Sequence, residues 1–222
     1  MKLSVVGLGK LGSPIVAVLA SKGYDVVGID ISREAVEQAT RAYGDFYRAE
    51  SLESYAASSP GVFDAIVMVE VIEHLEDPLT TIADAVRLLS PGGSLILTTP
   101  NRTYYGYERP WSTDLPPVHL WWFSEESIAV LARRVGCRAE FVDFRPYNAR
   151  YPVLHTFSCA HAAQLDAAGR VLRRESLPMA LARKLGMLHE GYWLASRAGG
   201  LLKRGDVSSR NRPTMVAVLR RD

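Results

Sequence analysis

The part of the sequence that most restricts the fold is residues 63–101, which read FDAIVMVEVIEHLEDPLTTIADAVRLLSPGGSLILTTPN. Residues 63–68 form an apolar run of the length of one buried strand. Pro78 suits the first turn of a helix, and apolar residues at helical spacing predict that this helix continues to about residue 89. A turn at 91–93 and a second apolar run at 94–99 follow. Strand, acidic loop, helix, turn and strand make a βαβ unit, which places two parallel strands in one sheet.

The first thirty residues predict a second unit of the same kind. An apolar strand at 3–6 precedes the sequence GLGKLG at 7–12, a helix at 13–22 and a strand at 26–29 that ends in Asp30. The glycines allow a cofactor to approach the backbone closely, and Asp30 can accept both hydrogen bonds of a ribose diol. The pattern indicates a nucleotide or nucleoside cofactor without specifying which.

The remaining elements follow from capping residues and apolar runs. Ser32 and Ser124 are expected N-caps, and Gly136 is expected to end the helix that Ser124 begins. Residues 102–120 are polar and rich in proline and aromatic residues, so we expect no regular element there. The expected elements are helices to Tyr43, at 52–57 and to Arg134, and strands at 45–49, 138–144 and 214–220.

Composition excludes several classes of protein. With 222 residues, 48% apolar residues and a net charge of +2, the chain is one globular domain or one domain with an elaboration, and it is no polycation. Two cysteines make no disulfide framework, so we expect a reduced, cytoplasmic setting. No apolar run reaches membrane-spanning length without a charge or a break.

Residues 145–212 depart from the rest of the chain. They carry 12 Arg and Lys against 4 Asp and Glu, a charge of +8, and show helical patterns near 155–174 and 178–202. They could form a solvated basic face, a cap that attracts an anionic substrate, or a membrane-surface segment. We therefore expect a core of residues 1–144 plus 213–222, and a mainly helical insertion at 145–212.

The central motifs resemble those of a known family. EVIEHLEDP at 70–78, PGG at 91–93, TTPN at 98–101, His119 and FSEES at 123–127 are similar to class I S-adenosylmethionine-dependent methyltransferases, in particular ubiquinone-biosynthesis O-methyltransferases. The resemblance implies a Rossmann-like, doubly wound α/β fold with a mostly parallel seven-stranded sheet and an antiparallel last strand. The length of residues 145–212 adds the expectation of a helical insertion before that strand. It implies methyl transfer from S-adenosylmethionine, here expected on a hydroxyl of a small molecule or saccharide.

The resemblance also implies roles for individual residues. Val5 and Leu11 depart from the family, which usually has an acid and a glycine at those positions. His119 and His74 are the candidate general bases, which would remove the proton of the acceptor. Gly7 and Gly9 are expected at the methionine part of the cofactor, Asp30 at the ribose, and Ala49, Glu50 and Val69 near the adenine; Leu8 and Ile31 are also expected to bind the cofactor.

A divalent metal site is expected at Glu70, Glu73, His74 and His119. This pattern resembles the metal site of small-RNA 2′-O-methyltransferases, and its first three residues resemble one proposed in ubiquinone O-methyltransferases. Two carboxylates and two imidazoles suit Mn²⁺, Fe²⁺, Co²⁺ or Zn²⁺ better than Mg²⁺. The alternative is that Glu73 and His74 only hold their loop by hydrogen bonds.

Three other functions stay open. Residues 1–30 also resemble nucleotide-sugar dehydrogenases, which favours an NAD-dependent dehydrogenase-like protein. Val5 and Leu11 favour a cofactor-binding protein without catalysis. The metal pattern favours an RNA 2′-O-methyltransferase, although a nucleic-acid partner is less expected than a small acceptor because the chain as a whole is nearly neutral.

Overall fold

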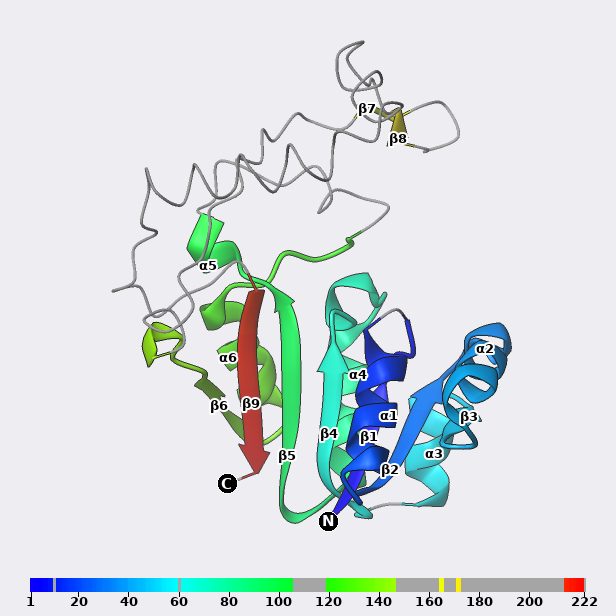
Figure 1. The fold of residues 1–222 in the computed structure, drawn as a ribbon. Helices are drawn as coiled ribbons and strands as arrows, with labels where there is room; N and C mark the ends of the chain where they lie inside the picture. The colour runs from blue at the N-terminus through cyan, green and yellow to red at the C-terminus, as the bar shows by residue number, and fades with distance from the viewer. Residues whose placement is uncertain are drawn as a thin grey trace. The chain divides into compact units, whose positions relative to one another are not determined.

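The structure, a computed structural model, describes residues 1–9, 11–59, 61–105, 119–146, 164–165, 171–172 and 214–221. Residues 1–104, 120–142 and 213–222 form one compact unit, and residues 105–119 and 143–212 form another. The first unit contains the sheet and its helices (Figure 1). In the described part of the chain, no helix is both long enough and apolar enough to cross a bilayer.

A seven-stranded sheet in the order β3-β2-β1-β4-β5-β9-β6 organises the first unit. The five strands from β3 to β5 pair in parallel, whereas β9 is antiparallel to both β5 and β6. The predicted Rossmann-like α/β fold with an antiparallel last strand is therefore confirmed. The strands are β1 (Lys2–Val6), β2 (Asp25–Asp30), β3 (Tyr47–Ala49), β4 (Phe63–Val69), β5 (Leu89–Pro100), β6 (Cys137–Phe141) and β9 (Thr214–Arg221).

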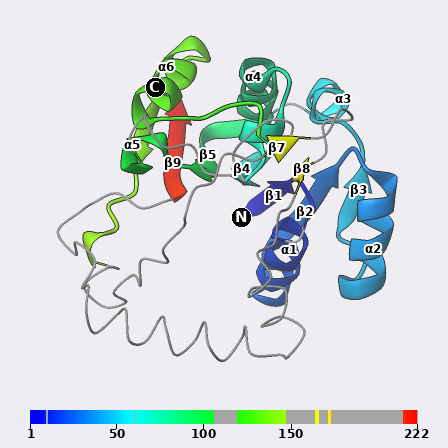
Figure 2. The same ribbon diagram turned by 90° about the horizontal axis from the view of Figure 1, so that it is seen from above.

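Helices cover both faces of the sheet. Seen from above in Figure 2, α1 and α2 lie on one side, and α3, α4 and α6 lie on the other. Each face buries its own apolar cluster, one around Leu3, Val5 and Val16 and a larger one around Ile66, Leu95 and Ile128. The helices are α1 (Gly12–Ser21), α2 (Arg33–Tyr43), α3 (Leu52–Ser58), α4 (Pro78–Leu88), α5 (Arg102–Tyr105) and α6 (Glu125–Arg134), with a short 3₁₀ helix at Ile72–His74.

Local sequence sets the helix ends. The Ser32 side chain accepts a hydrogen bond from the Ala35 amide, and Ser124 forms a capping box with Ser127, so both predicted N-caps are confirmed. Asp77 caps α4 directly before Pro78. Hydrogen bonds from the Thr80 side chain, and then from its backbone N–H, hold the pKa of Asp77 below its usual value. These caps fix where α4 and α6 begin.

Three expectations about elements were wrong. The predicted turn at 91–93 is a bulge inside β5, because Phe63 pairs with Leu89 and Ala65 with Ser94, which leaves the intervening residues unmatched. Residues 102–105 form α5, where Asn101 accepts a hydrogen bond from the Thr103 amide. Strand β6 ends at Phe141, short of the expected residue 144.

The described part of the insertion also differs from expectation. A helix near 155–174 was predicted, but β7 (Gln164–Leu165) and β8 (Val171–Leu172) pair antiparallel. Gly169 lies between these strands and disfavours a continuous helix. The expected helix at 178–202 falls outside the described residues, and the expected cap role of residues 145–212 stays a prediction.

Candidate functional site

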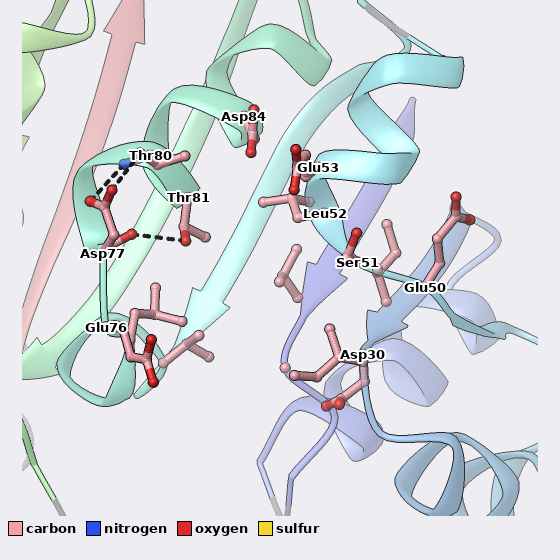
Figure 3. A pocket seen from close by; sticks show the side chains of 16 residues that line it. Asp30, Glu50, Ser51, Leu52, Glu53, Glu76, Asp77, Thr80, Thr81 and Asp84 are labelled. Carbon is pink, nitrogen blue, oxygen red and sulfur yellow. Dashed lines mark hydrogen bonds between the residues drawn. The ribbon is translucent and has the colours of Figure 1, made fainter.

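A cleft of about 670 Å³ opens where the strand order reverses, between β1 and β4. Ligands of doubly wound sheets bind at this position, beyond the carboxyl ends of the strands. The cleft is lined by the ends of β1 and β2, the start of α3, and the segment from Val71 into α4 (Figure 3). Its volume is in the range of small-molecule and cofactor sites.

The glycine turn after β1 forms one wall of the cleft. Gly7 lines the cleft with φ of +85°, and its amide donates to the Ile29 carbonyl at 2.9 Å. A Cβ on Gly7 would lie 2.5 Å from Val71 Cγ2, so a side chain there would close the turn against the far wall. A Cβ on Gly12 would lie 1.9 Å from the Gly7 carbonyl oxygen. Gly12 therefore lets α1 pack directly under the turn.

Asp30 is held at the end of β2 by the backbone. Its Oδ2 accepts from the Leu8 amide and its Oδ1 from the Ser32 amide, each at 2.7 Å. The side chain lies in the cleft and is only partly buried. Each carboxylate oxygen can accept a second hydrogen bond. The backbone thus fixes the orientation of the Asp30 carboxylate at the cleft, and its role toward a ribose diol stays a prediction.

The cleft is acidic. Figure 3 shows Asp30, Glu50 and Glu53 on one side and Glu76, Asp77 and Asp84 on the other. None of the described lining residues is Lys or Arg, although Arg87 pairs with Asp84 at 3.0 Å. Six carboxylates in one cleft create a negative potential that favours a cationic ligand and opposes a phosphorylated one.

The expected cofactor residues divide into two groups. Gly7, Asp30, Ile31 and Glu50 line the cleft. The others do not: Leu8 is buried against Gly28, Gly9 is exposed at the turn, and Ala49 and Val69 end their strands outside the lining.

The two departures from the family pattern have different positions. Val5 is fully buried in the core, so its side chain cannot reach a ligand. Leu11 is 54% exposed at the start of α1. Neither residue can therefore take over the role of the acid or the glycine that the family usually has at that position.

Sequence reasoning missed the contribution of α3 and α4 to the cleft. Leu52 and Glu53 come from α3, and Thr80, Thr81 and Asp84 from α4. Thr81 and Asp84 are three residues apart and so share a helix face, which is the available sequence signal. The spacing alone does not show whether this face of α4 points toward the cleft.

Three of the four predicted metal ligands lie together. One ligand atom from each of Glu73, His74 and His119 lies within 4.8 Å of the others. His119 directly precedes Leu120, whose amide donates to the Glu73 carbonyl at 2.8 Å. Glu73 is fully buried, and its Oε2 accepts from the Thr99 hydroxyl at 3.0 Å, whereas His74 is exposed. A carboxylate and two imidazoles form a donor set that suits Mn²⁺, Fe²⁺, Co²⁺ or Zn²⁺.

Glu70 lies outside this cluster. Its backbone has a φ of +53°, rare for a residue with a side chain, and its amide donates to the Thr98 carbonyl. The Thr98 hydroxyl donates to Glu70 Oε1 at 2.9 Å. Glu70 therefore ties the end of β4 to β5 in this structure.

Comparison with known proteins decides the family. Residues 11–140, more than half of the chain, match a family model described as a methyltransferase domain. The chain belongs to this methyltransferase family. Ubiquinone biosynthesis O-methyltransferases from Xanthomonas campestris and Methylococcus capsulatus are 38% and 36% identical over 104 and 107 residues. The two matches cover 45% and 46% of this chain, and 44% and 45% of the two relatives. The chain therefore spans less than half the length of the curated relatives that it matches.

Solved structures share the fold of this methyltransferase domain. S-adenosylmethionine-dependent methyltransferases from Archaeoglobus fulgidus and Mesorhizobium loti have TM-scores of 0.56 and 0.55, with 11% and 15% identity. The alignments cover 99% of this chain in both cases, and 86% and 90% of those chains. The predicted class I methyltransferase domain is confirmed, and the family implies S-adenosylmethionine as methyl donor.

Proposed function

We propose that the protein transfers a methyl group from S-adenosylmethionine to a hydroxyl oxygen of a small molecule or saccharide. The observation that carries this proposal is the grouping of Glu73, His74 and His119 beside the cofactor cleft. Val71 and Leu75, which flank the first two of these residues in sequence, line that cleft. A proton acceptor next to the methyl donor is what a hydroxyl nucleophile requires.

The charge of the cleft supports this cofactor over NAD. S-adenosylmethionine carries a net positive charge because of its sulfonium, whereas NAD carries a diphosphate. The six carboxylates that line the cleft attract the first and repel the second. Asp30 would hold the ribose diol, and the turn at Gly7 would let the methionine part lie along the backbone.

In the reaction, the acceptor oxygen attacks the methyl carbon in line with the carbon–sulfur bond. The O–C bond forms, the C–S bond breaks, and its electron pair leaves with sulfur as neutral S-adenosylhomocysteine. Without a bound ion, the hydroxyl proton passes to an imidazole of His74 or His119. Because the sulfonium already activates the methyl group, the protein contributes mainly alignment and this proton transfer.

A divalent metal fits the same three residues. One ligand atom from each of the three side chains already lies within 4.8 Å of the others, so movements of the side chains would bring them onto one ion. When bound, such an ion would lower the pKa of a coordinated acceptor hydroxyl. We expect Glu73, His74 and His119 to hold the ion. We expect Glu70 to lie outside the coordination sphere, because its carboxylate accepts a hydrogen bond from the Thr98 hydroxyl.

Methyl transfer from S-adenosyl-[methyl-¹³C]methionine to a small-molecule extract tests the acceptor chemistry. The ¹³C chemical shift separates O-methyl, N-methyl and C-methyl products, and we expect an O-methyl signal that is absent with heat-inactivated protein. A signal on nitrogen or carbon alone would overturn the proposal.

Metal content tests the cluster separately from activity. After loading with Mn²⁺ and gel filtration, mass spectrometry should find bound metal in wild type and in Glu70→Gln, but not in Glu73→Gln or His119→Ala. Metal retained by Glu73→Gln, or lost only in Glu70→Gln, contradicts this ligand set. If no variant retains metal, the imidazoles act as bases without an ion.

A further inference from the structure

A second hollow of the first unit, about 610 Å³ in volume, lies between the start of α4 and α6. We call it the Trp121–Trp122 groove, and it is distinct from the cofactor cleft except for a shared wall at Glu76 and Asp77. Trp121 and Trp122 are 44% and 43% exposed. Two neighbouring indoles exposed to this extent are uncommon away from interaction sites.

The groove combines an apolar lining with carboxylates. Apolar side chains from α4, from the segment before α6 and from α6 itself form most of it. Among the described residues, three acids, Glu76, Asp77 and Glu126, and one cation, Arg134, also line it. Asp77 is charged at neutral pH, and hydrogen bonds from Thr80 hold its pKa below the usual value. The apolar members are Pro78, Leu79, Trp121, Trp122, Phe123, Val130 and Leu131.

The indole of Trp121 is fixed in place. Its Nε1–H donates to the Leu75 carbonyl at 2.7 Å, and its ring stacks on Phe123 with centroids 6.4 Å apart and planes at 23°. The indole N–H is the only polar group of the Trp121 side chain, and it already donates to the Leu75 carbonyl. A ligand therefore contacts the indole through its π surface. A guanidinium or ammonium group is attracted to such a surface, and nearby carboxylates strengthen that attraction.

We propose that the Trp121–Trp122 groove binds a cationic, aliphatic peptide segment of a partner protein. Excess carboxylates oppose nucleic acid and anionic lipid, whose phosphates would meet Glu76, Asp77 and Glu126. A volume of about 610 Å³ accommodates a few side chains, and the Pro78, Leu79 and Val130 side chains suit aliphatic residues beside the cation. The charge complementarity therefore selects a peptide that carries arginine or lysine.

The groove is coupled to the cofactor cleft through one short segment. Leu75 lines the cleft and its carbonyl is held by Trp121, while Glu76 and Asp77 line both hollows. A peptide that displaced the Trp121 indole would therefore also displace Leu75 in the wall of the cofactor cleft. By linkage, a peptide that alters cofactor affinity must have its own affinity altered by the same factor.

The test uses the full chain labelled with 5-fluorotryptophan, whose four tryptophans give four ¹⁹F resonances that Trp→Phe variants assign. The probe is a blocked nine-residue peptide of leucine and arginine, and its control replaces each arginine by glutamate. We expect the Trp121 and Trp122 resonances to shift saturably with the arginine peptide only. Equal shifts with both peptides, shifts confined to the other two tryptophans, or no shift overturn the proposal, as do shifts with phosphatidylglycerol vesicles instead.

Variants outside the cofactor cleft locate the binding. Glu126→Gln should weaken binding of the arginine peptide about twofold to fivefold, which is the effect of removing one exposed charge. Trp122→Ala should weaken it about twofold to thirtyfold, the range of a cation–π contact. Glu37→Gln on α2, across the sheet from the groove, makes the same charge change as Glu126→Gln and should leave binding unaltered. Equal loss in Glu37→Gln and Glu126→Gln would mean that only the overall charge matters.

Discussion

Replacing Gly12 by alanine should destabilise the fold at the turn that forms the cofactor cleft. The new Cβ would lie 1.9 Å from the Gly7 carbonyl oxygen, more than 1 Å inside the 3.0 Å below which Cβ contacts essentially do not occur. The obstructing atom belongs to the backbone, so no side-chain rotation relieves the contact. Either α1 or the turn must shift by over an ångström.

The expected cost is about 3 kcal/mol, the upper part of the range for overpacking. For a chain of this length, 1 kcal/mol corresponds to roughly 2–4 °C in Tm, so Gly12→Ala should lower Tm by about 6–12 °C. Thermal unfolding followed by circular dichroism measures this. The matched control is Gly9→Ala, because a Cβ on Gly9 meets nothing within 4 Å.

The two variants also separate folding from binding. Gly9→Ala should keep the Tm of wild type, yet bind S-adenosylhomocysteine more weakly if the cofactor passes over the turn as the sequence predicts. A Gly12→Ala protein as stable as wild type would show that α1 does not pack under the turn as described. Unaltered binding in Gly9→Ala would remove Gly9 from the cofactor site.

Three further predictions concern single side chains. Asp30→Ala should weaken binding of S-adenosylhomocysteine by about 1–3 kcal/mol in titration calorimetry, because the ribose hydroxyls lose their hydrogen-bond acceptor. If the variant binds with wild-type affinity, Asp30 is not part of the site. Ser124→Ala should lower the free energy of unfolding by about 1 kcal/mol in urea, because α6 loses its capping box, and no loss would contradict that cap. The lowered pKa of Asp77 means that its charged form stabilises the folded state, so this contribution is present above the ordinary carboxyl pKa of 3.8 and is lost as pH falls through the lowered value. As the pH falls from neutral to below 3.8, Asp77→Asn should therefore lose less Tm than wild type does, and identical Tm profiles of the two proteins would count against this reasoning.

The central strands of the sheet were predictable because each is a compact apolar run between strong breakers. Residues 63–68 and 94–99 have no other plausible place than a buried sheet, and Ser32 and Ser124 mark helix starts by their side-chain chemistry. By contrast, the Pro91–Gly93 sequence has the composition of a turn whether it ends a strand or bulges within one. Pairing of Leu89 with Phe63 decides between these, and pairing is a long-range contact.

The candidate site was predictable only in part, for a related reason. Asp30, Glu73 and His74 follow strand ends, and topology brings strand ends together. Thr81 and Asp84 lie within a helix, and whether they face the cleft depends on how α4 packs over the sheet. The link between Trp121 and Leu75 joins residues 46 positions apart, which no local pattern encodes.

Calorimetric titration of the full chain with S-adenosylhomocysteine and with NAD tests the central claim most directly. The acidic cleft, the Asp30 carboxylate and the family predict one S-adenosylhomocysteine per chain and no measurable NAD binding. Tighter binding of NAD than of S-adenosylhomocysteine, abolished by Asp30→Ala, would place a dinucleotide in this cleft and contradict the proposed methyl transfer.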